Sequence, residues 1–343
     1  PPRSTLFPYT TLFRSARLLT QATFGPRRAE LAEVQSLGVA GWINAQLALP
    51  WTSHRAATLA DFRTFGGGGN GIVIQNNRQA AWWNTVVNAP DQLRQRVAFA
   101  LSQIFVVSDV PLDDFYTEGL AHYYDQLGNG AFGNFRTLLE TVSRSPIMGT
   151  YLSSLRNAKA DPALGTTPDE NYAREVMQLF TIGLHLLQPD GTLKLDPSGL
   201  PIPTYNQGTI TEMAKVFTGW AFASPKANPS FRFETADLIN PMQLYPAFHD
   251  DGAKAIVNGA VLRPGQGGLA DLQQTMDTLF RHPNTGPFIA RQLIQRLVTS
   301  NPTPAYVYRV ARVFENNGSG VRGDLGAVVR AILSDFEARS PTT

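Results

Sequence analysis

The residues best suited to chemistry lie in one stretch near the middle of the chain, Pro168-Asp-Glu-Asn-Tyr-Ala-Arg-Glu-Val-Met-Gln-Leu-Phe-Thr-Ile-Gly183. At 100° per residue, one face of a helix would collect its polar side chains, which are Glu170, Asn171, Arg174, Glu175 and Gln178. Carboxylates on such a face can transfer protons, and an arginine can bind an anionic substrate or lower the pKa of a neighbouring carboxyl group. Glu170 and Glu175 are therefore candidate catalytic residues, and Asn171 and Arg174 are candidate binding residues.

A second polar group follows in a later, irregular segment, where His249, Asp250 and Lys254 lie close together in sequence. Paired carboxylates with a histidine can carry out general acid–base hydrolysis, and such a group could also bind a divalent metal ion. The hydrolase hypothesis therefore adds His249 and Asp250 as catalytic residues and Lys254 as a binding residue. It requires His249 to lie within hydrogen-bond or shared-metal reach of Glu170 and Glu175, beside an open cavity.

Two structural interpretations of the central face compete with catalysis. In the first, Glu170 and Arg174 form an ordinary i,i+4 ion pair on a solvated face, worth about 0.2–0.5 kcal/mol. In the second, neighbouring helices bury the face, and Glu175, Arg174 and Asn171 form a polar network that holds those helices in register. The sequence has neither an H-E-x-x-H zinc motif nor a G-x-S-x-G nucleophile elbow, so catalysis gains no support from a known motif.

Composition narrows the classes of function. The 29 basic and 27 acidic residues are spread along 343 positions without a basic stripe, which argues against nucleic acid as a partner. Because there is no cysteine, iron–sulfur clusters, covalent haem attachment and disulfides are excluded. A formal G-x-G-x-x-G at 66–71 follows no β-branched strand, so it predicts a flexible loop and not a nucleotide site. The chain contains no run of about 18 apolar residues, so the sequence predicts no membrane span.

The elements that must position the candidate residues are predicted to be helices. Apolar side chains recur at helical spacing in residues 75–88, 91–105, 113–126 and 134–145, and again between 269 and 333. For the central helix, Asp169 is the predicted N-cap and Gly183 the predicted end. Thr209 and Glu212 have the spacing of a capping box that would open a further helix.

Two segments depart from this helical pattern. Gln188-Pro-Asp-Gly and Asp196-Pro-Ser-Gly predict two turns, and hence a small hairpin around 192–195. Residues 221–268 are rich in proline, glycine and aromatic residues, and predict an irregular excursion or lid. The expected fold is mainly α, a multi-helix bundle with a short β-hairpin and one long irregular excursion, in a single helical domain over residues 16–339. Residues 1–15 resemble translated sequencing-adapter read-through from environmental reads, and we expect them to be unstructured.

The central stretch and the later run Ala214-Lys-Val-Phe-Thr-Gly-Trp220 closely resemble the bacterial family catalogued as domain of unknown function 1800. Further matching motifs are Ala22-Thr-Phe-Gly-Pro26, Gln92-Leu-Arg-Gln-Arg-Val-Ala-Phe-Ala-Leu-Ser-Gln103, His249-Asp250 with Lys254, His282-Pro283 and Gly320-Val-Arg-Gly-Asp-Leu325. The resemblance covers most of residues 16–339. It implies an exported protein of the periplasm or cell surface, often encoded beside a sulfatase-like family, with no established catalytic residues. Because members commonly run longer, it also implies a fragment of a longer domain.

Two classes of function remain open on this basis. The first is a non-catalytic binding or assembly partner of a co-encoded, sulfatase-like surface protein. The second is a hydrolase, metal-assisted or not, built on Glu170, Glu175, His249 and Asp250. The two differ in geometry, because only the hydrolase needs the two polar groups to meet.

Overall fold

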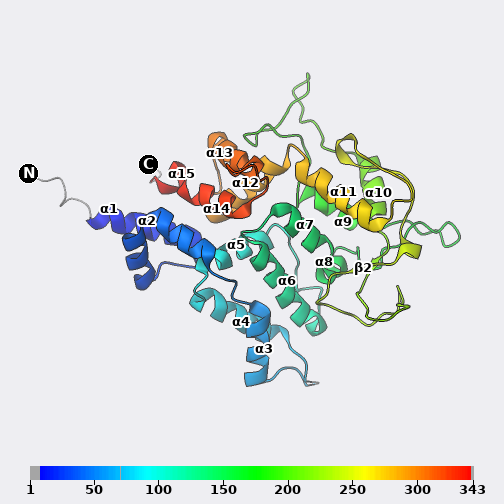
Figure 1. Ribbon diagram of the computed structural model, residues 1–343, viewed down its shortest axis with the longest axis horizontal. Coiled ribbons are helices and arrows are strands. Elements are labelled where there is room, and N and C mark those ends of the chain that lie inside the picture. The colour runs from blue at the N-terminus through cyan, green and yellow to red at the C-terminus, as the bar shows by residue number, and fades with distance from the viewer. Residues whose placement is uncertain (1–7, 70, 341–343) are drawn as a thin grey trace, which may run out of the picture.

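Helices carry most of the regular structure in residues 8–69 and 71–340, the part of the chain that the computed structural model describes (Figure 1). The mainly-α prediction is therefore confirmed. The first half of the chain contains α1 (Pro8–Ala22), α2 (Arg28–Ala48), α3 (His54–Phe65), α4 (Gln75–Asn88), α5 (Gln92–Ser102), the 3-10 helix η1 (Asp114–Tyr116), α6 (Thr117–Gly130), α7 (Phe135–Ser143) and α8 (Pro146–Tyr151).

The second half adds four two-residue strands to the remaining helices. Its elements are α9 (Asn171–Gln178), α10 (Gln207–Val216), β1 (Trp220–Ala221), β2 (Gln243–Leu244), η2 (Pro246–Phe248), β3 (Lys254–Ala255), η3 (Val257–Gly259), β4 (Val261–Leu262), α11 (Gly268–Arg281), α12 (Thr285–Leu297), α13 (Pro304–Glu315), α14 (Leu325–Ser334) and α15 (Phe336–Arg339). Strand β1 pairs antiparallel with β2, and β3 pairs antiparallel with β4. Helices α1 and α2 lie beside α14 and α15 at one end of the molecule, and α9, α10 and α11 lie toward the other (Figure 1).

One hydrophobic core runs from Leu18 in α1 to Ala338 in α15. Near its centre, the ring of Phe105 contacts those of Phe135 and Phe180, with centroids 6.0 and 5.3 Å apart, and Phe135 contacts Phe314 at 5.6 Å. These fully buried rings come from four segments that are far apart in the sequence. Contacts between aromatic rings stabilise a core by more than the area that they bury. These rings therefore hold the segment after α9 against both halves of the chain.

The central helix is shorter than the predicted helix over 168–183. Helix α9 ends at Gln178, and the chain continues in a wider turn in which Phe180 N donates to Glu175 O at 3.1 Å. Gly183, with φ of 70°, then ends the turn as predicted, because a glycine adopts positive φ without steric cost. The apolar side chains opposite the polar face, Tyr172, Ala173, Val176, Met177 and Phe180, are buried, whereas Leu179 in the widened turn is exposed.

The predicted capping box at the start of α10 is wrong. Asn206 caps this helix, its side-chain oxygen accepting from Thr209 N at 3.0 Å. Because the helix begins at Gln207, Thr209 occupies the third helical position and cannot be the N-cap. Glu212 instead pairs with Lys215 on the next turn.

Helix α1 extends back to Pro8, so the structure differs from the expected unstructured segment over residues 8–15. Residues 1–7 of that segment lie outside the described residues. Leu18 and Leu19, in the second half of α1, are fully buried and fix this part of the helix, and a helix that is already formed propagates at little cost. This explains the extension in physical terms.

Residues 184–203, which we call the leucine arm, contain both predicted turns but no regular hairpin. Gly191 and Gly199 adopt φ of 78° and 82° at the two turns. The backbone hydrogen bonds form a closed ring, in which Leu186 N donates to Ile202 O, Ile202 N to Lys194 O, and Lys194 N to Leu186 O. The arm is therefore three extended segments bonded around a common axis.

The irregular segment 221–268 packs onto the helices. Its buried apolar side chains are Phe222, Phe231, Met242, Tyr245, Ile256, Val257 and Leu262. Phe231 also stacks on Phe248, with ring centroids 4.0 Å apart, in a small core of its own. Such burial is typical of a fixed excursion and not of a mobile lid.

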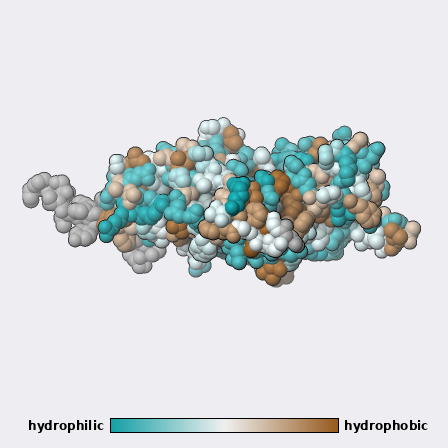
Figure 2. Space-filling view, turned by 90° about the horizontal axis from the view of Figure 1, so that it is seen from below, coloured by the Kyte–Doolittle hydropathy of each residue, from teal (hydrophilic) through white to brown (hydrophobic). Residues whose placement is uncertain are grey.

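Hydrophobic side chains also reach the surface in several places. Figure 2 shows hydrophobic and hydrophilic residues mixed over the face seen from below, with a group of hydrophobic residues near its middle. Scattered exposure of this kind is ordinary in folded proteins.

The turn before β1 provides a test of the fold. Gly219 has φ of 80°, and a Cβ there would lie 2.9 Å from His249 N and 3.0 Å from Tyr245 O. Gly219→Ala therefore meets both the left-handed strain, about 1–2 kcal/mol, and a backbone clash that adds about 1–3 kcal/mol. We expect the free energy of unfolding, measured by urea denaturation, to fall by the sum of these two costs.

Gly199→Ala is the matched control, because Gly199 has φ of 82° and no atom within 4 Å of the added Cβ. This variant should lose only the strain energy. Equal losses for the two variants would contradict the close packing of Gly219 against the irregular segment.

Candidate functional site

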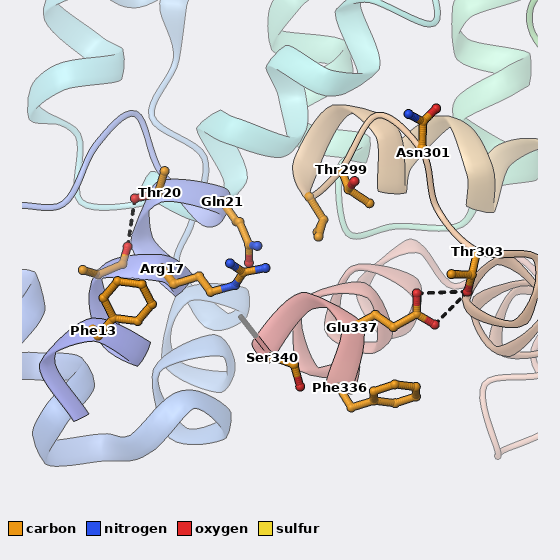
Figure 3. Close-up of a pocket in the computed structure, with 12 residues that line it drawn as sticks. Phe13, Arg17, Thr20, Gln21, Thr299, Asn301, Thr303, Phe336, Glu337 and Ser340 are labelled. Carbon is orange, nitrogen blue, oxygen red and sulfur yellow. Dashed lines mark hydrogen bonds between the residues drawn. The ribbon is translucent and has the colours of Figure 1, made fainter. Parts of the chain in front are cut away.

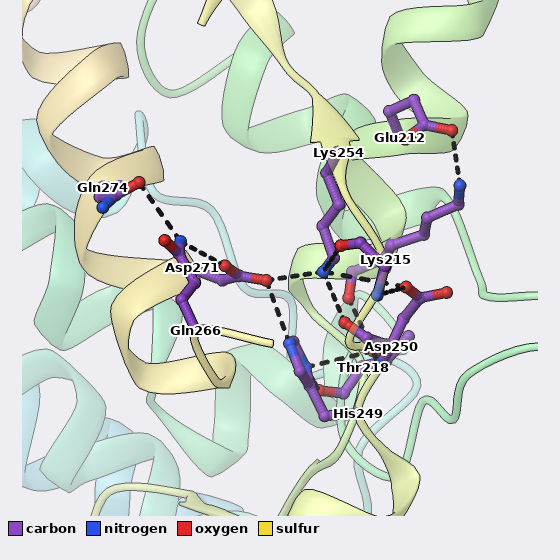
Figure 4. Close-up of polar contacts among 10 residues, drawn as sticks. Glu212, Lys215, Thr218, His249, Asp250, Lys254, Gln266, Asp271 and Gln274 are labelled. Atoms are coloured by element: carbon purple, nitrogen blue, oxygen red, sulfur yellow. Dashed lines mark hydrogen bonds and ion pairs between the residues drawn. The ribbon is translucent and has the colours of Figure 1, made fainter. Parts of the chain in front are cut away.

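A buried ion network lies where the irregular segment meets α10 and α11 (Figure 4). Asp271, in α11, is its centre. Lys254 Nζ lies 2.7 Å from Asp271 Oδ2, and His249 Nε2 lies 3.2 Å from the same oxygen. Gln266 Nε2 donates to Asp271 Oδ1 at 2.6 Å. The side chains of Lys254, His249 and Asp271 are at most 2% exposed.

The ammonium group of Lys254 has three acceptors around it. It donates to Asp271, to the backbone oxygen of Asp250, and to Gly252 O at 2.9 Å. An ammonium group has three protons, so these contacts engage all of them. All three protons of Lys254, the predicted binding residue, are therefore donated to acceptors within the protein.

His249 is held from both sides of its ring. Nδ1 lies 2.9 Å from Thr218 O and can donate to it, and the contact of Nε2 with Asp271 is an ion pair whenever the ring is protonated. Asp250, the next residue, donates its backbone N–H to Thr218 Oγ1 at 2.9 Å. These contacts fasten the 249–254 loop to the end of α10.

The hydrogen bonds keep the Asp271 carboxylate ionised. Burial disfavours its charge, but hydrogen bonds from His249, Lys254 and Gln266 outweigh burial, and the pKa of the carboxyl lies below its ordinary value. A lowered pKa in the folded state contributes stability at neutral pH, which is lost as the pH falls through the folded value.

The exposed half of the α9 face connects α9 to α10. Glu170 accepts from Thr211 Oγ1 at 2.8 Å and from Gln207 Nε2 at 2.7 Å, and it pairs with Arg174 at 3.3 Å. The hydrogen bonds from Thr211 and Gln207 lower the pKa of the Glu170 carboxyl. Asn171 is exposed. This part of the face is thus partly solvated, and it also joins α9 to α10, so each of the two structural interpretations describes it in part.

Glu175 differs from the rest of the face. Its Oε2 is buried and has no hydrogen-bond partner among the described residues, and the hydroxyl of Tyr205 is in the same condition. Burial raises the pKa of the Glu175 carboxyl, against the opposing effect of Arg174. The carboxylate is therefore held at a cost to stability.

The two predicted groups do not meet through any polar contact. Across the described residues, no hydrogen bond or ion pair joins Glu170 or Glu175 to His249 or Asp250. Nor do the described residues place three or more His, Asp or Glu side chains where they could hold a metal ion. Glu170 bonds Gln207 and Thr211 in the first turns of α10, whereas His249 and Asp250 bond Thr218 just beyond its last residue, so the four candidate catalytic residues share no polar network among the described residues.

Sequence reasoning missed Asp271, the centre of the network. The buried stripe of α11 consists of Gly268, Asp271, Leu272, Thr275, Met276 and Leu279. An acidic residue on an otherwise buried stripe is a signal in itself, because an isolated buried charge is too costly to keep. Its ion-pair partners, Lys254 and His249, lie 17 and 22 residues earlier, and no local sequence pattern identifies them as partners.

A sequence model of a family described as protein of unknown function (DUF1800) matches residues 17–343. The chain belongs to this family. Comparison with curated proteins and with solved structures finds no match. Among the described helices of this DUF1800 chain, none is both long and apolar enough to cross a membrane.

The DUF1800 chain also has a wide groove between α1, residues 298–303 and α15 (Figure 3). Its volume is about 830 Å³. Glu337, on one wall, accepts from Thr303 Oγ1 at 2.8 Å and pairs with Arg309, and Arg17 Nε donates to Ala338 O at 2.8 Å. Both charged groups, Glu337 and Arg17, therefore already have partners within the protein. Phe13, from the adapter-like segment 1–15, also lines the groove.

Removing the buried ammonium of the DUF1800 chain tests the ion network. Lys254→Met leaves the Asp271 carboxylate buried with only His249 and Gln266, so the free energy of unfolding at neutral pH should fall by about 3–5 kcal/mol. Because Asp271 has a lowered pKa, the difference should shrink below about pH 4. Urea denaturation at the two pH values measures both effects.

Lys159→Met is the control for this substitution, since Lys159 is exposed. It should change the unfolding free energy by less than about 0.5 kcal/mol. A similar small change for Lys254→Met would mean that the network contributes nothing to stability.

Glu175→Gln should stabilise the DUF1800 chain. The carboxyl has a raised pKa, so its contribution is most favourable at low pH and is lost as the pH rises above the ordinary value of 4.5. A neutral amide avoids that loss, and the thermal midpoint at neutral pH should rise by about 1–2 °C.

Glu170→Gln is the matched control on the same face. It removes a carboxylate whose pKa is lowered by Thr211 and Gln207, so the midpoint should fall slightly or stay the same. If Glu175→Gln instead lowered the midpoint by many degrees, Glu175 would belong to a register-holding network.

Proposed function

We propose that this chain is a non-catalytic binding protein, exported to the periplasm or cell surface, that assembles with a co-encoded sulfatase-like protein. The observation that carries the proposal is the set of exposed leucines on the leucine arm. Leu184, Leu193, Leu195 and Leu200 are 50%, 47%, 55% and 63% exposed. Leu184, Leu193 and Leu195 also line neighbouring hollows, and exposed apolar residues gathered in this way are typical of surfaces that bind another protein.

The leucine arm is the green loop that rises at the top of Figure 1, and two hollows lie along it where it meets α12 and α13. Their volumes are about 320 and 480 Å³, and Leu193 and Arg291 line both of them. Apolar hollows of this kind can accept the side chains of a partner.

Arg291 adds a charge preference to this surface. Its side chain is exposed, and no ion pair engages it among the described residues. An acidic side chain of the partner, flanked by apolar ones, would satisfy Arg291 and fill both hollows. Such complementarity increases specificity and the rate of association.

The base of the arm is already fixed. Asn284 Nδ2 donates to Ile182 O and to His185 O at 2.8 Å, and Asn284 Oδ1 accepts from Leu187 N at 2.9 Å. A surface that is ordered before binding loses little conformational entropy on association, which supports a docking role.

The engagement of Lys254 and His249 in the ion network also supports a non-catalytic role, since neither has a free polar atom for a substrate. Membership of the family supports the partner, because related proteins are expected to be encoded beside sulfatase-like proteins.

The alternative function is a hydrolase, with or without a divalent metal. One observation favours it, the unpartnered Oε2 of Glu175 beside Arg174, with a raised pKa that suits a general acid. Ester or phosphate-ester hydrolysis that Glu175→Gln abolishes would establish this alternative.

The assembly proposal is tested by calorimetric titration with the purified sulfatase-like protein encoded beside this chain. We expect binding by the parent, and a loss of at least about tenfold in affinity for Leu193→Asp, because a carboxylate would be buried between the two hollows.

Leu164→Asp is the control, since Leu164 is 66% exposed on a different loop. This variant should bind like the parent. Absence of binding by the parent, or equal loss in both variants, would rule out the leucine arm as the docking surface.

A further inference from the structure

A small cavity lies between α3, α4, α5 and α6, and its polar lining residues include His54, Arg78, Ser102 and Tyr124. Its volume is about 60 Å³. A water molecule needs about 10–15 Å³ measured in this way, so the cavity has room for about four waters or for a molecule with about as many non-hydrogen atoms.

Three buried polar atoms of the lining residues have no hydrogen-bond partner among the described residues. They are His54 Nδ1, Arg78 Nε and Tyr124 Oη, and the proton of the Tyr124 hydroxyl has no acceptor although the Trp82 indole N–H lies beside this oxygen. The side chain of His54 belongs to a residue that is only 2% exposed. Each unsatisfied buried group costs about 1–3 kcal/mol, so three of them around one cavity indicate a polar occupant.

The neighbours of His54 determine which ring nitrogen has the proton. His54 Nε2 lies 2.6 Å from Gln95 Oε1, and Gln95 Nε2 donates to Thr52 O and to Asp91 Oδ2. Gln95 Oε1 is therefore the acceptor, and His54 Nε2 is the donor. In the neutral ring, Nδ1 then has a lone pair and is free to take up a proton.

Charged groups of both signs surround the cavity, since Asp91 and Asp125 lie near His54, and two arginines lie nearby as well. Arg78 forms an ion pair with Asp109. Arg96 lies near Tyr124, and its Nη2 donates to Arg296 O at 2.7 Å, but its Nη1 is buried without a partner. No carboxylate pairs with Arg96 in the part of the chain that is described. Arg78 Nε–H and the Tyr124 hydroxyl can both donate, so an occupant with acceptor oxygens, such as a carboxylate, would satisfy them.

We propose that the cavity binds a small monocarboxylate of about the size of acetate, together with one proton on His54 Nδ1. The carboxylate oxygens can accept from His54 Nδ1–H, from the Tyr124 hydroxyl and from Arg78 Nε–H. The other ring nitrogen of His54 continues to donate to Gln95. All three unsatisfied atoms then gain partners, and the carboxylate forms an ion pair with the imidazolium ring.

Binding is coupled to pH through His54. The charged groups that face it are Asp125 of α6, Asp91 before α5 and Arg78 of α4. Burial lowers the pKa of the His54 ring despite the hydrogen bond to Gln95 and the two aspartates. The ring is therefore neutral in the empty cavity at neutral pH, and the carboxylate must bind with a proton, so affinity rises as the pH falls.

The test is calorimetric titration of the whole chain with sodium acetate at about pH 5.5 and about pH 7.5, with sodium chloride at the same ionic strength as the reference. Buffers of different ionisation enthalpy report the protons exchanged. We expect uptake of about one proton per acetate and affinity at least about tenfold higher at the lower pH.

Tyr124→Phe removes one hydroxyl and keeps the ring packing, and it should weaken acetate binding by about five- to tenfold. Tyr308→Phe is the control, since Tyr308 is exposed on α13, and it should leave binding unchanged. Thermal unfolding checks that both variants fold.

Several results would overturn the proposal. They are no acetate binding at either pH, binding equal to that of chloride, affinity independent of pH, or an unchanged affinity in Tyr124→Phe. A crystal grown in acetate with only water in the cavity would also overturn it. None of these results bears on the leucine arm, so the carboxylate site and the assembly proposal can fail separately.

Discussion

The ion pair between Asp271 and Lys254 is the interaction on which the second half of the molecule depends. It joins α11 to β3, and through Lys254 it also fixes the backbone of the 249–254 loop. Two buried charges are stable only when each is fully hydrogen-bonded, and this requirement limits the loop to one conformation. A segment of nearly fifty residues with four short strands can thus stay packed without extensive regular structure.

Side chains with reactive functional groups are used here mainly to hold elements together. Glu170 connects α9 to Gln207 and Thr211 of α10, and His249 connects the irregular segment to the end of the same helix. These contacts hold α10 at its first turns and just beyond its last residue, through groups that the sequence places in one candidate site. Glu175 is the exception, because one of its oxygens is buried without a partner.

Much of the helical framework could be predicted from periodicity, because each amphipathic stripe is a local property of the sequence. The buried face of α9, including Tyr172 and Met177, follows the 3.6-residue period. The start of α10 could not be placed to the residue, since Asn206 and Thr209 are both good N-caps and only one can be used. The partners of Asp271 and of His54 could not be predicted, because they come from other segments and no local pattern in the sequence specifies such pairings.

The complete engagement of Lys254 has a consequence for its chemical reactivity. An amine attacks acylating reagents only through a free lone pair, and this ammonium is fully buried with every proton on an oxygen acceptor. Trypsin, which needs an accessible lysine in an extended chain, is excluded in the same way. Both reactions at Lys254 must wait for the network to open, so their rates report the local opening of the segment that ends at α11, separately from unfolding of the whole chain.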